Sequence, residues 1–171
     1  MFKKGNNIDN IDDNLWLGNL SAAKDIKDLK EKGITKILTI MEKDFPEYKS
    51  EDGFVHKRIE LIDYIDQNII KFFGECLNFI KGDEKVLVHC QSGASRSATI
   101  VIAYLMWNKK MKYMEASKYV KEKRFIVFPN PGFREQLKMF EKLLIKNDYD
   151  IQKINFDTIE WDVDKVKLGY S

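Results

Sequence analysis

Residues 86–97 read VLVHCQSGASRS, and this stretch decides how the rest of the chain is interpreted. Its first residues, Val86 to Val88, form the compact apolar run that indicates a buried strand. The segment Ser97–Trp107 is apolar nearly all round, which is typical of a helix in the middle of a core. The sequence therefore predicts a strand, a short loop and a buried helix, with Cys90 at the base of the loop and Arg96 at the start of the helix.

This loop has the features of an anion site. Successive N–H groups can curl into a concave nest, and the N-terminus of the following helix adds partial positive charge. A guanidinium at position 96 can hold two oxygens of one anion, which a lysine could not do. Gly93 allows close backbone approach or a positive φ. We therefore expect a site the size of one phosphate or sulfate, formed by Gln91, Ser92, Gly93, Ala94, Ser95 and Arg96.

Cys90 is the predicted nucleophile. A cysteine in positive surroundings at a helix N-terminus exists largely as the thiolate, which is the reactive form. A thiolate aimed at bound phosphorus predicts displacement through a covalent phosphocysteine. Ser97 is positioned to donate a hydrogen bond to this sulfur and help it leave. His89 is interpreted as a support for the cysteine backbone or the loop, or simply as a buried core histidine.

The departing oxygen needs a proton, so a carboxylic acid has to reach the site from another loop. Asp63 and Asp66 both lie in the segment LIDYIDQ (61–67), between a predicted strand and a predicted helix. Asp66 lies near the helix start, where a capping role is common. We therefore prefer Asp63 as the acid and keep Asp66 as the competitor.

The surrounding pattern predicts an α/β domain over residues 1–146, with helices packed on a small mixed or parallel sheet. Apolar runs predict strands at 15–18, 34–41, 55–61 and 85–89. Helical spacing predicts helices at 22–32, 67–81, 97–107, 113–123 and 132–146. Cys76 falls on the apolar face of the 67–81 helix, so we interpret it as a core residue, with a redox partnership to Cys90 as the alternative.

Residues 147–171 differ from the rest because apolar and polar residues alternate at period two, which is a strand-like pattern. Two interpretations remain for this extension. It is an extended arm packed on its own domain, which we favour, or it is an edge that mediates a homodimer or binds a partner.

Composition excludes several function classes. With 171 residues, a net charge of +2 and no basic stripe, the chain is one domain and not a general nucleic-acid binder. Two cysteines are too few for a disulfide scaffold. We find neither a signal peptide nor an apolar run of membrane-spanning length, so we expect no membrane partner and a cytoplasmic, or alternatively nuclear, location.

Several segments together resemble the dual-specificity protein phosphatases, a group of cysteine-dependent phosphatases. The resemblance rests on the loop from His89 to Ser97, and on LWLGN (15–19), GITKIL (33–38), SRSAT through AYLM (95–106) and FPNPGF (128–133). It covers about residues 11–144, with Trp16 where the family usually has Tyr. A Cys-x5-Arg motif alone is common by chance. The resemblance is specific because this motif lies between a buried strand and a buried helix.

The resemblance implies the cysteine-dependent phosphatase fold and hydrolysis of phosphotyrosine and phosphoserine/threonine on a phosphorylated protein, with no metal or other cofactor. In that family the acid precedes an aromatic pair by nine and ten residues. Phe72 and Phe73 stand at those distances from Asp63, which supports Asp63 over Asp66. Asn130 is a candidate brace for the loop, although Asn also simply forms turns. The basic run 118–124 is interpreted as a solvated helix face, with Arg124 as a candidate contact on the site side.

Other functions fit the residues less well. A phosphoinositide phosphatase or an RNA triphosphatase calls for more positive charge in or around the loop, and residues 91–95 carry none. The low-molecular-weight tyrosine phosphatases and arsenate reductases have their loop near the N-terminus, whereas here it lies mid-chain. A phosphate-binding pseudophosphatase, acting as a scaffold, calls for a missing nucleophile, arginine or acid, and all three are present.

Overall fold

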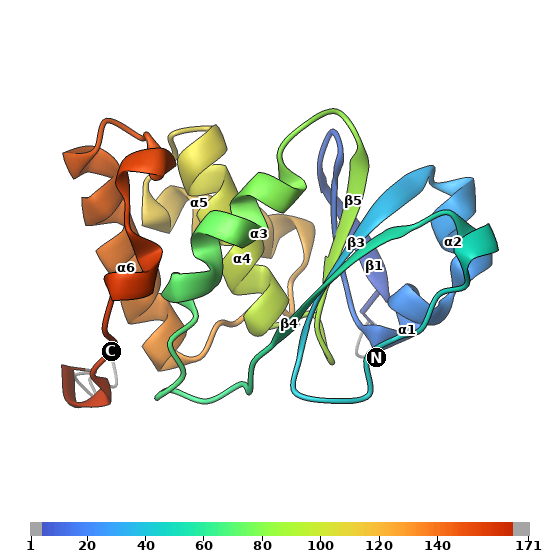
Figure 1. The fold of residues 1–171 in the computed structure, drawn as a ribbon, viewed down its shortest axis with the longest axis horizontal. Coiled ribbons are helices and arrows are strands. Elements are labelled where there is room, and N and C mark those ends of the chain that lie inside the picture. The colour runs from blue at the N-terminus through green and yellow to red at the C-terminus, as the bar shows by residue number, and fades with distance from the viewer. Residues whose placement is uncertain (1–4, 166–171) are drawn as a thin grey trace.

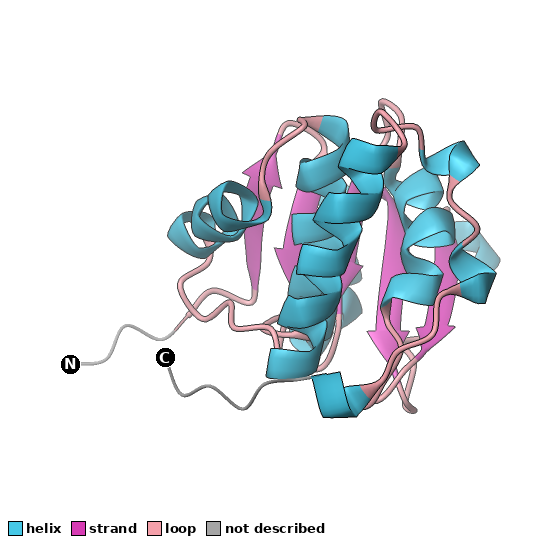
Figure 2. Ribbon diagram, turned by 90° about the vertical axis from the view of Figure 1, so that its left-hand side faces the viewer, coloured by secondary structure: helices cyan, strands magenta, loops and turns pink. Residues whose placement is uncertain are grey.

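The computed structural model describes residues 5–165 as a five-stranded sheet with helices on both faces (Figures 1 and 2). The strands are β1 (Ile8–Asp12), β2 (Leu15–Gly18), β3 (Ile34–Met41), β4 (Val55–Glu60) and β5 (Lys85–His89). The helices are α1 (Leu20–Lys24), α2 (Ile26–Glu31), α3 (Phe73–Ile80), α4 (Arg96–Asn108), α5 (Tyr113–Lys123) and α6 (Pro131–Lys146). This mixed α/β architecture confirms the predicted fold class.

The sheet has the order β1-β2-β5-β3-β4, and β1 pairs with β2 in the antiparallel sense while every other pair is parallel. Strand β5 therefore lies in the centre, between β2 and β3. Helices α1 and α2 cover one face and α3 to α6 cover the other (Figure 1). Because the carboxyl ends of parallel strands meet at one edge, the loop after β5 opens among the ends of β2, β3 and β4.

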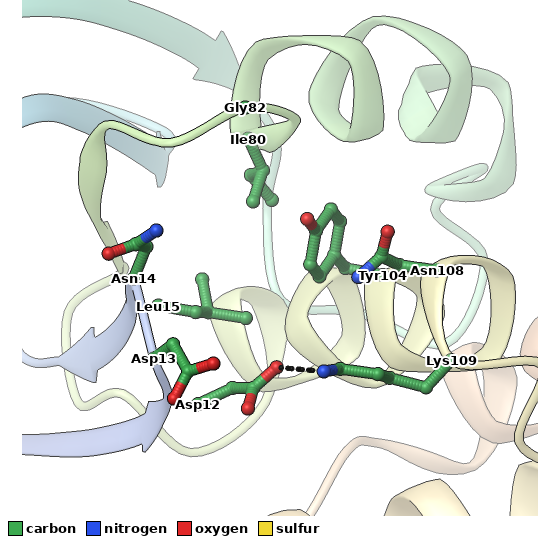
Figure 3. Close-up of a pocket in the computed structure, with 9 residues that line it drawn as sticks. All are labelled: Asp12, Asp13, Asn14, Leu15, Ile80, Gly82, Tyr104, Asn108 and Lys109. Carbon is green, nitrogen blue, oxygen red and sulfur yellow. Dashed lines mark ion pairs between the residues drawn. The ribbon is translucent and has the colours of Figure 1, made fainter.

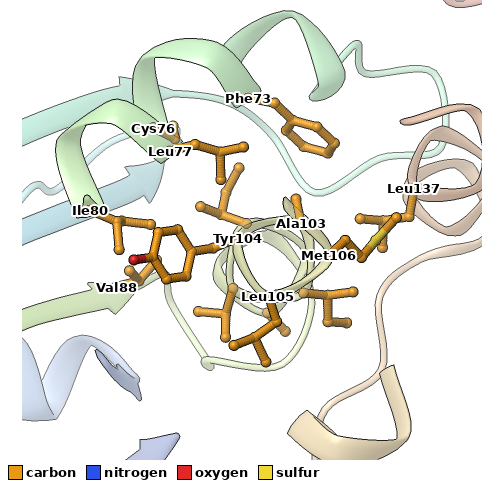
Figure 4. Close-up of a cluster of buried hydrophobic side chains, with 14 of the residues drawn as sticks. Phe73, Cys76, Leu77, Ile80, Val88, Ala103, Tyr104, Leu105, Met106 and Leu137 are labelled. Atoms are coloured by element: carbon orange, nitrogen blue, oxygen red, sulfur yellow. The ribbon is translucent and has the colours of Figure 1, made fainter. Parts of the chain in front are cut away.

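Helix α4 is the centre of the larger core. Residues 96–106 are all buried, so this helix is surrounded on every side. Figure 4 shows side chains from α3, β5 and α6 packed around it. Phe73 on α3 meets Phe140 on α6 edge to face, with ring centroids 5.0 Å apart, a favoured arrangement of aromatic pairs. The almost uniformly apolar sequence of α4 is thus explained by its place, which fixes Arg96 at its buried N-terminus.

Two predicted helices are shorter than their apolar spacing suggested. The helix predicted at 22–32 is divided into α1 and α2, because the side chain of Asp25 caps α2 by accepting from the Asp28 N–H. The helix predicted at 67–81 begins as α3 only at Phe73, after a single 3-10 turn at Ile70–Phe72. The residues before that turn form the connection that carries Asp63 and Asp66.

The period-two prediction for residues 147–171 was wrong for the part that the structure describes. Residues 147–165 form 3-10 turns at Ile151–Lys153, Phe156–Thr158 and Val163–Lys165, with no strand among them. Ile151, Ile154 and Phe156 belong to the larger core. The apolar residues of this segment are therefore buried by 3-10 turns that pack on the domain, and not by one face of a strand. The alternation at Val166 and Leu168 lies outside the described residues.

Strand β1 was not predicted from the sequence. It contributes one fully buried apolar residue, Ile11, and lies at the sheet edge beside β2. Among residues 5–165, no helix combines the length and the apolar character needed to cross a bilayer.

Candidate active site

The loop of residues 90–95 joins the centre of the sheet to the N-terminus of α4. At Gly93 the backbone adopts φ +68°, and a Cβ there would lie 2.5 Å from the carbonyl oxygen of Gly18. Both the left-handed conformation and the close approach exclude a side chain. Glycine at position 93 therefore lets the loop fold back against the end of β2.

The Cys90 sulfur is the focus of this loop. The residue is 1% exposed, and its Sγ lies 3.0 Å from Ser97 Oγ. The backbone N–H of Gly93 also points at the sulfur, with N–Sγ 3.3 Å. Two donors directed at one sulfur stabilise a thiolate more than a thiol.

The rest of the loop presents unused donors. In the described part of the chain, the backbone N–H groups of Gln91, Ser92, Ala94, Ser95 and Arg96 have no hydrogen-bond acceptor. The buried Nε of Arg96 also has no partner there. Ser95 and Arg96 are buried, and buried donors are nearly always satisfied in folded proteins, so this concentration of free donors is the arrangement that suits an anion. The structure thus places the predicted residues 91–96 in one loop, which ends at the first residue of α4.

The Nη1 atom of Arg96, unlike its Nε, has hydrogen-bond partners within residues 5–165. It donates to Glu42 Oε2 and, over 3.0 Å, to the carbonyl oxygen of Leu61. The hydrogen bond from Arg96 lowers the pKa of Glu42 below its usual value. Glu42 was not identified from the sequence. Its position directly after β3 was the available signal, because the ends of adjacent parallel strands share one edge.

Asp63 lies beside the loop. Its Oδ1 accepts from Ser95 Oγ at 2.8 Å and from Asn130 Nδ2 at 2.9 Å. Asp66, the competing candidate, has a single side-chain hydrogen bond among the described residues, accepted from its neighbour Gln67. The structure therefore brings Asp63 to the loop of residues 90–95, whereas Asp66 makes no hydrogen bond to that loop within the described residues.

The segment 128–132 connects these parts. The N–H of Phe128 donates to Ala94 O at 2.8 Å, and the N–H of Asn130 donates to Ser95 Oγ at 3.0 Å. Asn130 also caps α6 by accepting from the Phe133 N–H. A Cβ at Gly132 would collide with the carbonyl of Ile65, so the helix start packs directly on the Asp63 segment. Asn130 thus acts both as a cap and as a contact of Asp63.

Arg124 supports the loop from behind. Its Nε donates to Gly93 O at 2.9 Å and its Nη2 to Ser92 O at 3.2 Å. Its Nη1 donates to Asp9 Oδ2 at 2.7 Å, and the side chain is almost fully buried. Arg124 thus makes the contact on the site side for which the sequence made it a candidate, through two carbonyl oxygens of the loop.

His89 is buried at the end of β5. Its Nδ1 lies 3.2 Å from the carbonyl oxygen of Cys90, and its Nε2 lies 2.7 Å from Thr39 Oγ1. Burial lowers the pKa of His89 to about 4, so the ring is neutral at physiological pH. Cys76 is also fully buried, on α3, and burial raises the pKa of its thiol. The thiol of Cys76 is therefore protonated and inert, as expected for a core residue.

A separate hollow of about 130 Å³ lies at the other end of α4 (Figure 3). Most of its lining is polar and comes from the β1–β2 turn and the C-terminal end of α4, and Leu15, Ile80 and Gly82 complete it. The polar residues include an ion pair between Asp12 and Lys109, with N–O 3.2 Å. The loop of residues 90–95 lies at the N-terminal end of the same helix. This hollow is consequently distinct from the candidate site around Cys90.

Comparison with known proteins gives a consistent result. Residues 15–143 match the family model described as "Dual specificity phosphatase, catalytic domain". The chain is 37% identical over 151 residues to the Arabidopsis thaliana protein named dual specificity protein phosphatase 1B, covering 86% of this chain and 89% of that one.

Solved structures agree with this match. The crystal structure of DUSP15 has a TM-score of 0.78 at 33% identity, covering 88% of this chain and 99% of that one. The human tyrosine phosphatase-like serine/threonine/tyrosine-interacting protein has a TM-score of 0.76 at 37% identity, covering 81% of this chain and 97% of that one.

Proposed function

This chain belongs to the dual specificity phosphatase family, and from that premise we propose that it hydrolyses phosphotyrosine and phosphoserine/threonine on proteins through a phosphocysteine intermediate. Family membership supports protein phosphatase activity. The course of the reaction is inferred from the contacts of this chain's own residues around Cys90.

The first step transfers the phosphoryl group to sulfur. The Cys90 thiolate attacks phosphorus, so the S–P bond forms as the bond from phosphorus to the substrate oxygen breaks. Asp63, in its protonated form, gives its proton to that oxygen, and the dephosphorylated hydroxyl leaves. The free N–H groups of the loop and the unpartnered Nε of Arg96 hold the three equatorial oxygens of the transferring group.

The second step regenerates the enzyme. A water molecule gives a proton to the Asp63 carboxylate and attacks phosphorus, the S–P bond breaks, and inorganic phosphate leaves. Ser97 Oγ, 3.0 Å from the sulfur, donates to the departing thiolate. Asn130 and Ser95 orient Asp63 for both proton transfers through their hydrogen bonds to Oδ1.

One observation carries this proposal. The Cys90 sulfur accepts from Ser97 and Gly93 at the base of a loop whose remaining N–H groups point to no acceptor in residues 5–165. A site that only bound phosphate, the scaffold alternative, would need the donors but not a stabilised sulfur. The presence of both favours the enzyme.

The test is hydrolysis of an aryl phosphate, with a chelator and no added metal, by the wild type, Cys90→Ser and Cys76→Ser. We expect turnover by the wild type, none by Cys90→Ser, and retained turnover by Cys76→Ser, which makes the same atomic change at a cysteine outside the site. Thermal unfolding of each variant checks that loss of activity is not loss of fold. Turnover by Cys90→Ser at the wild-type rate would refute the nucleophile, and a wild type with no turnover that still binds phosphate would favour the scaffold.

A further inference from the structure

A line of hydrogen bonds crosses the sheet from its outer strand to the proposed nucleophile. Thr39 lies on β3, between His89 on β5 and His56 on β4. Its Oγ1 lies 2.7 Å from His89 Nε2 and 2.8 Å from His56 Nε2. Thr39 and His89 are direct partners in the parallel ladder, so their side chains point to the same face. Ile37 and Leu87, two positions earlier on these strands, cluster with residues of α1 and α2, so this is the face that α1 and α2 cover.

The direction of each hydrogen bond in this line follows from chemistry. The Cys90 carbonyl can only accept, so Nδ1 of His89 carries a proton and donates to it. Because His89 is neutral, its Nε2 is bare and accepts from the Thr39 hydroxyl. The Thr39 oxygen is then left as the acceptor for His56, whose Nε2 must carry the proton. This assigns the Nδ1–H tautomer to His89 and the Nε2–H tautomer to His56.

The outer end of the line is also determined. With its proton on Nε2, His56 has a bare Nδ1, which lies 3.5 Å from Arg58 Nε. Burial, and then the charge of Arg58, lower the pKa of His56 to about 4, so this ring is neutral as well. The edge-to-face ring of Tyr48, 4.9 Å from the imidazole, covers its remaining side. Every donor therefore points the same way, from Arg58 through His56, Thr39 and His89 to the Cys90 carbonyl.

We propose that His56 and Thr39 are positioning residues for the loop of residues 90–95, called the phosphate loop from here on. They fix the tautomer and orientation of His89, which in turn holds the Cys90 peptide. With its carbonyl oxygen held by His89, that peptide cannot turn its negative end toward the anion, and the N–H groups that follow remain directed into the site. Hydrogen bonds aligned in series also polarise one another, so loss of an outer member weakens the inner ones. This proposal rests on the proposed function for its catalytic consequence, but not for its structural content.

Nuclear magnetic resonance tests the structural content directly. The chain contains two histidines, so a long-range ¹H–¹⁵N spectrum shows only two imidazoles, which His56→Gln assigns by removing one. We expect one Nδ1–H tautomer, from His89, and one Nε2–H tautomer, from His56, both unchanged between pH 8 and pH 6. The opposite tautomers, or a charged ring at pH 6, would overturn the proposal, whether or not the protein hydrolyses phosphate.

Matched substitutions test the consequence. Thr39→Val is isosteric but removes the hydroxyl, whereas Thr39→Ser keeps it. His56→Leu removes the donor, whereas His56→Gln keeps an N–H near the position of Nε2. We expect Thr39→Val and His56→Leu to lose about fivefold in kcat, the factor that corresponds to one net hydrogen bond, with KM little changed. Thr39→Ser and His56→Gln should recover most of that loss.

The reactivity of Cys90 toward iodoacetamide, measured by peptide mass spectrometry across pH, distinguishes positioning from a purely structural role. Substitutions of Thr39 or His56 that affected only stability would leave this pH profile unchanged. We expect the midpoint of this pH profile to move upward in Thr39→Val and His56→Leu and to return in the two conservative variants. Lys57→Gln is the control, because Lys57 neighbours His56 on β4 but pairs with Glu75 instead. An unmoved midpoint in stably folded Thr39→Val would overturn the proposal while leaving the phosphatase assignment intact. If the midpoint moves in Thr39→Val but the wild type shows no turnover, the positioning role stands and the phosphatase assignment fails.

Discussion

Ser95 Oγ donates to Asp63 Oδ1 over 2.8 Å, although the two residues belong to different segments of the chain. Ser95 is the last residue of the phosphate loop, and Asp63 lies in the connection after β4. This hydrogen bond therefore joins the proposed acid directly to the loop that is proposed to hold the phosphoryl group. The same Ser95 hydroxyl accepts from the Asn130 N–H, which makes it the common point of three segments.

This relationship predicts different outcomes for the two candidate acids. Asp63→Asn should lower kcat for a phosphate ester with a basic leaving group by about 10²- to 10⁴-fold, the usual contribution of a general acid, with little change in KM. Asp66→Asn is the matched control and should retain most activity, because Asp66 contacts neither the loop nor Asn130. The measurement is steady-state kinetics with phosphotyrosine. The reverse pattern would reassign the acid to Asp66.

Ser97→Ala should separate the two chemical steps. Without its hydroxyl, the thiolate that departs from phosphorus loses one of its two donors, whereas the attack on the substrate is affected less. We expect phosphocysteine to accumulate in Ser97→Ala and to be detected by mass spectrometry after rapid acid quenching. Ser97→Thr, which keeps the hydroxyl, is the comparison. Equal amounts of intermediate in Ser97→Ala and wild type would show that Ser97 does not assist the second step.

Glu42→Gln should change how strongly phosphate stabilises the fold. In the wild type the Glu42 carboxylate partly neutralises Arg96, which is 5% exposed. Without that charge, a buried cation is left without its partner, so the variant should unfold at lower temperature. Added inorganic phosphate should then raise its Tm more than it raises the wild-type Tm, because bound anion replaces the missing charge. Identical phosphate-induced shifts would contradict this.

Acid should destabilise the protein in a defined pH range. The pKa of both histidines falls from 6.5 to about 4 in the folded state, chiefly because burial disfavours the charged ring. The unfolded chain therefore binds protons below pH 6.5 that the folded chain does not, and stability is lost as the pH falls from about 6.5 toward 4.

Denaturant titrations at several pH values measure this dependence. A histidine that titrates only when unfolded contributes a slope of about 1.4 kcal/mol per pH unit to the free energy of unfolding. His56→Gln removes one of the two histidines and should lessen the slope between pH 6 and pH 5. A slope unchanged by this substitution would show that His56 is charged in the folded protein.

The C-terminal turns should contribute to stability through packing. Phe156 lies against Gly74 of α3, where a Cβ would approach its ring to 2.7 Å, and its ring centroid is 6.1 Å from that of Phe140. Phe156→Ala should lower the free energy of unfolding by roughly 2–4 kcal/mol, slightly below the range for a fully buried Phe. Phe128→Ala, at an exposed ring, is the control and should change it little. Equal stability of both variants would show that residues 151–156 do not pack as described.

The local pattern of apolar residues was sufficient to predict a helix or strand where one face of it, or one continuous run of its residues, is buried. The predicted β5 and α5 agree with the structure in their bounds, and α4 begins one residue earlier than predicted, because burial there is reflected directly in the apolar spacing. Strand β1 escaped prediction because its sequence, IDNID, has little apolar content and gains its order from pairing with β2. The strand-like prediction for residues 147–171 failed for the opposite reason. The period-two alternation is clear in the sequence, but in the described residues it arises from successive 3-10 turns.

The same distinction applies to the site, where some residues could be predicted from a local segment of sequence and others could not. Residues 90–97 are contiguous, so the sequence alone was sufficient to place Cys90, Arg96 and Ser97 in one site. Asp63 was found because it lies on a loop at the expected edge. The roles of Glu42 and Thr39 depend on strand register and on which side chains meet across neighbouring strands. Such contacts are properties of the assembled sheet and have no signature in a single segment.

The connection that carries Asp63 is held by residues far along the chain. Trp161 Nε1 donates to Ile65 O at 2.7 Å, and Asn68 Nδ2 donates to Ile159 O at 2.7 Å. A ribosome extends the chain from its N-terminus at about 5–20 residues per second. The nucleophile and its loop therefore emerge well before Ile159 and Trp161, and the acid segment acquires these two contacts only after synthesis has passed residue 161.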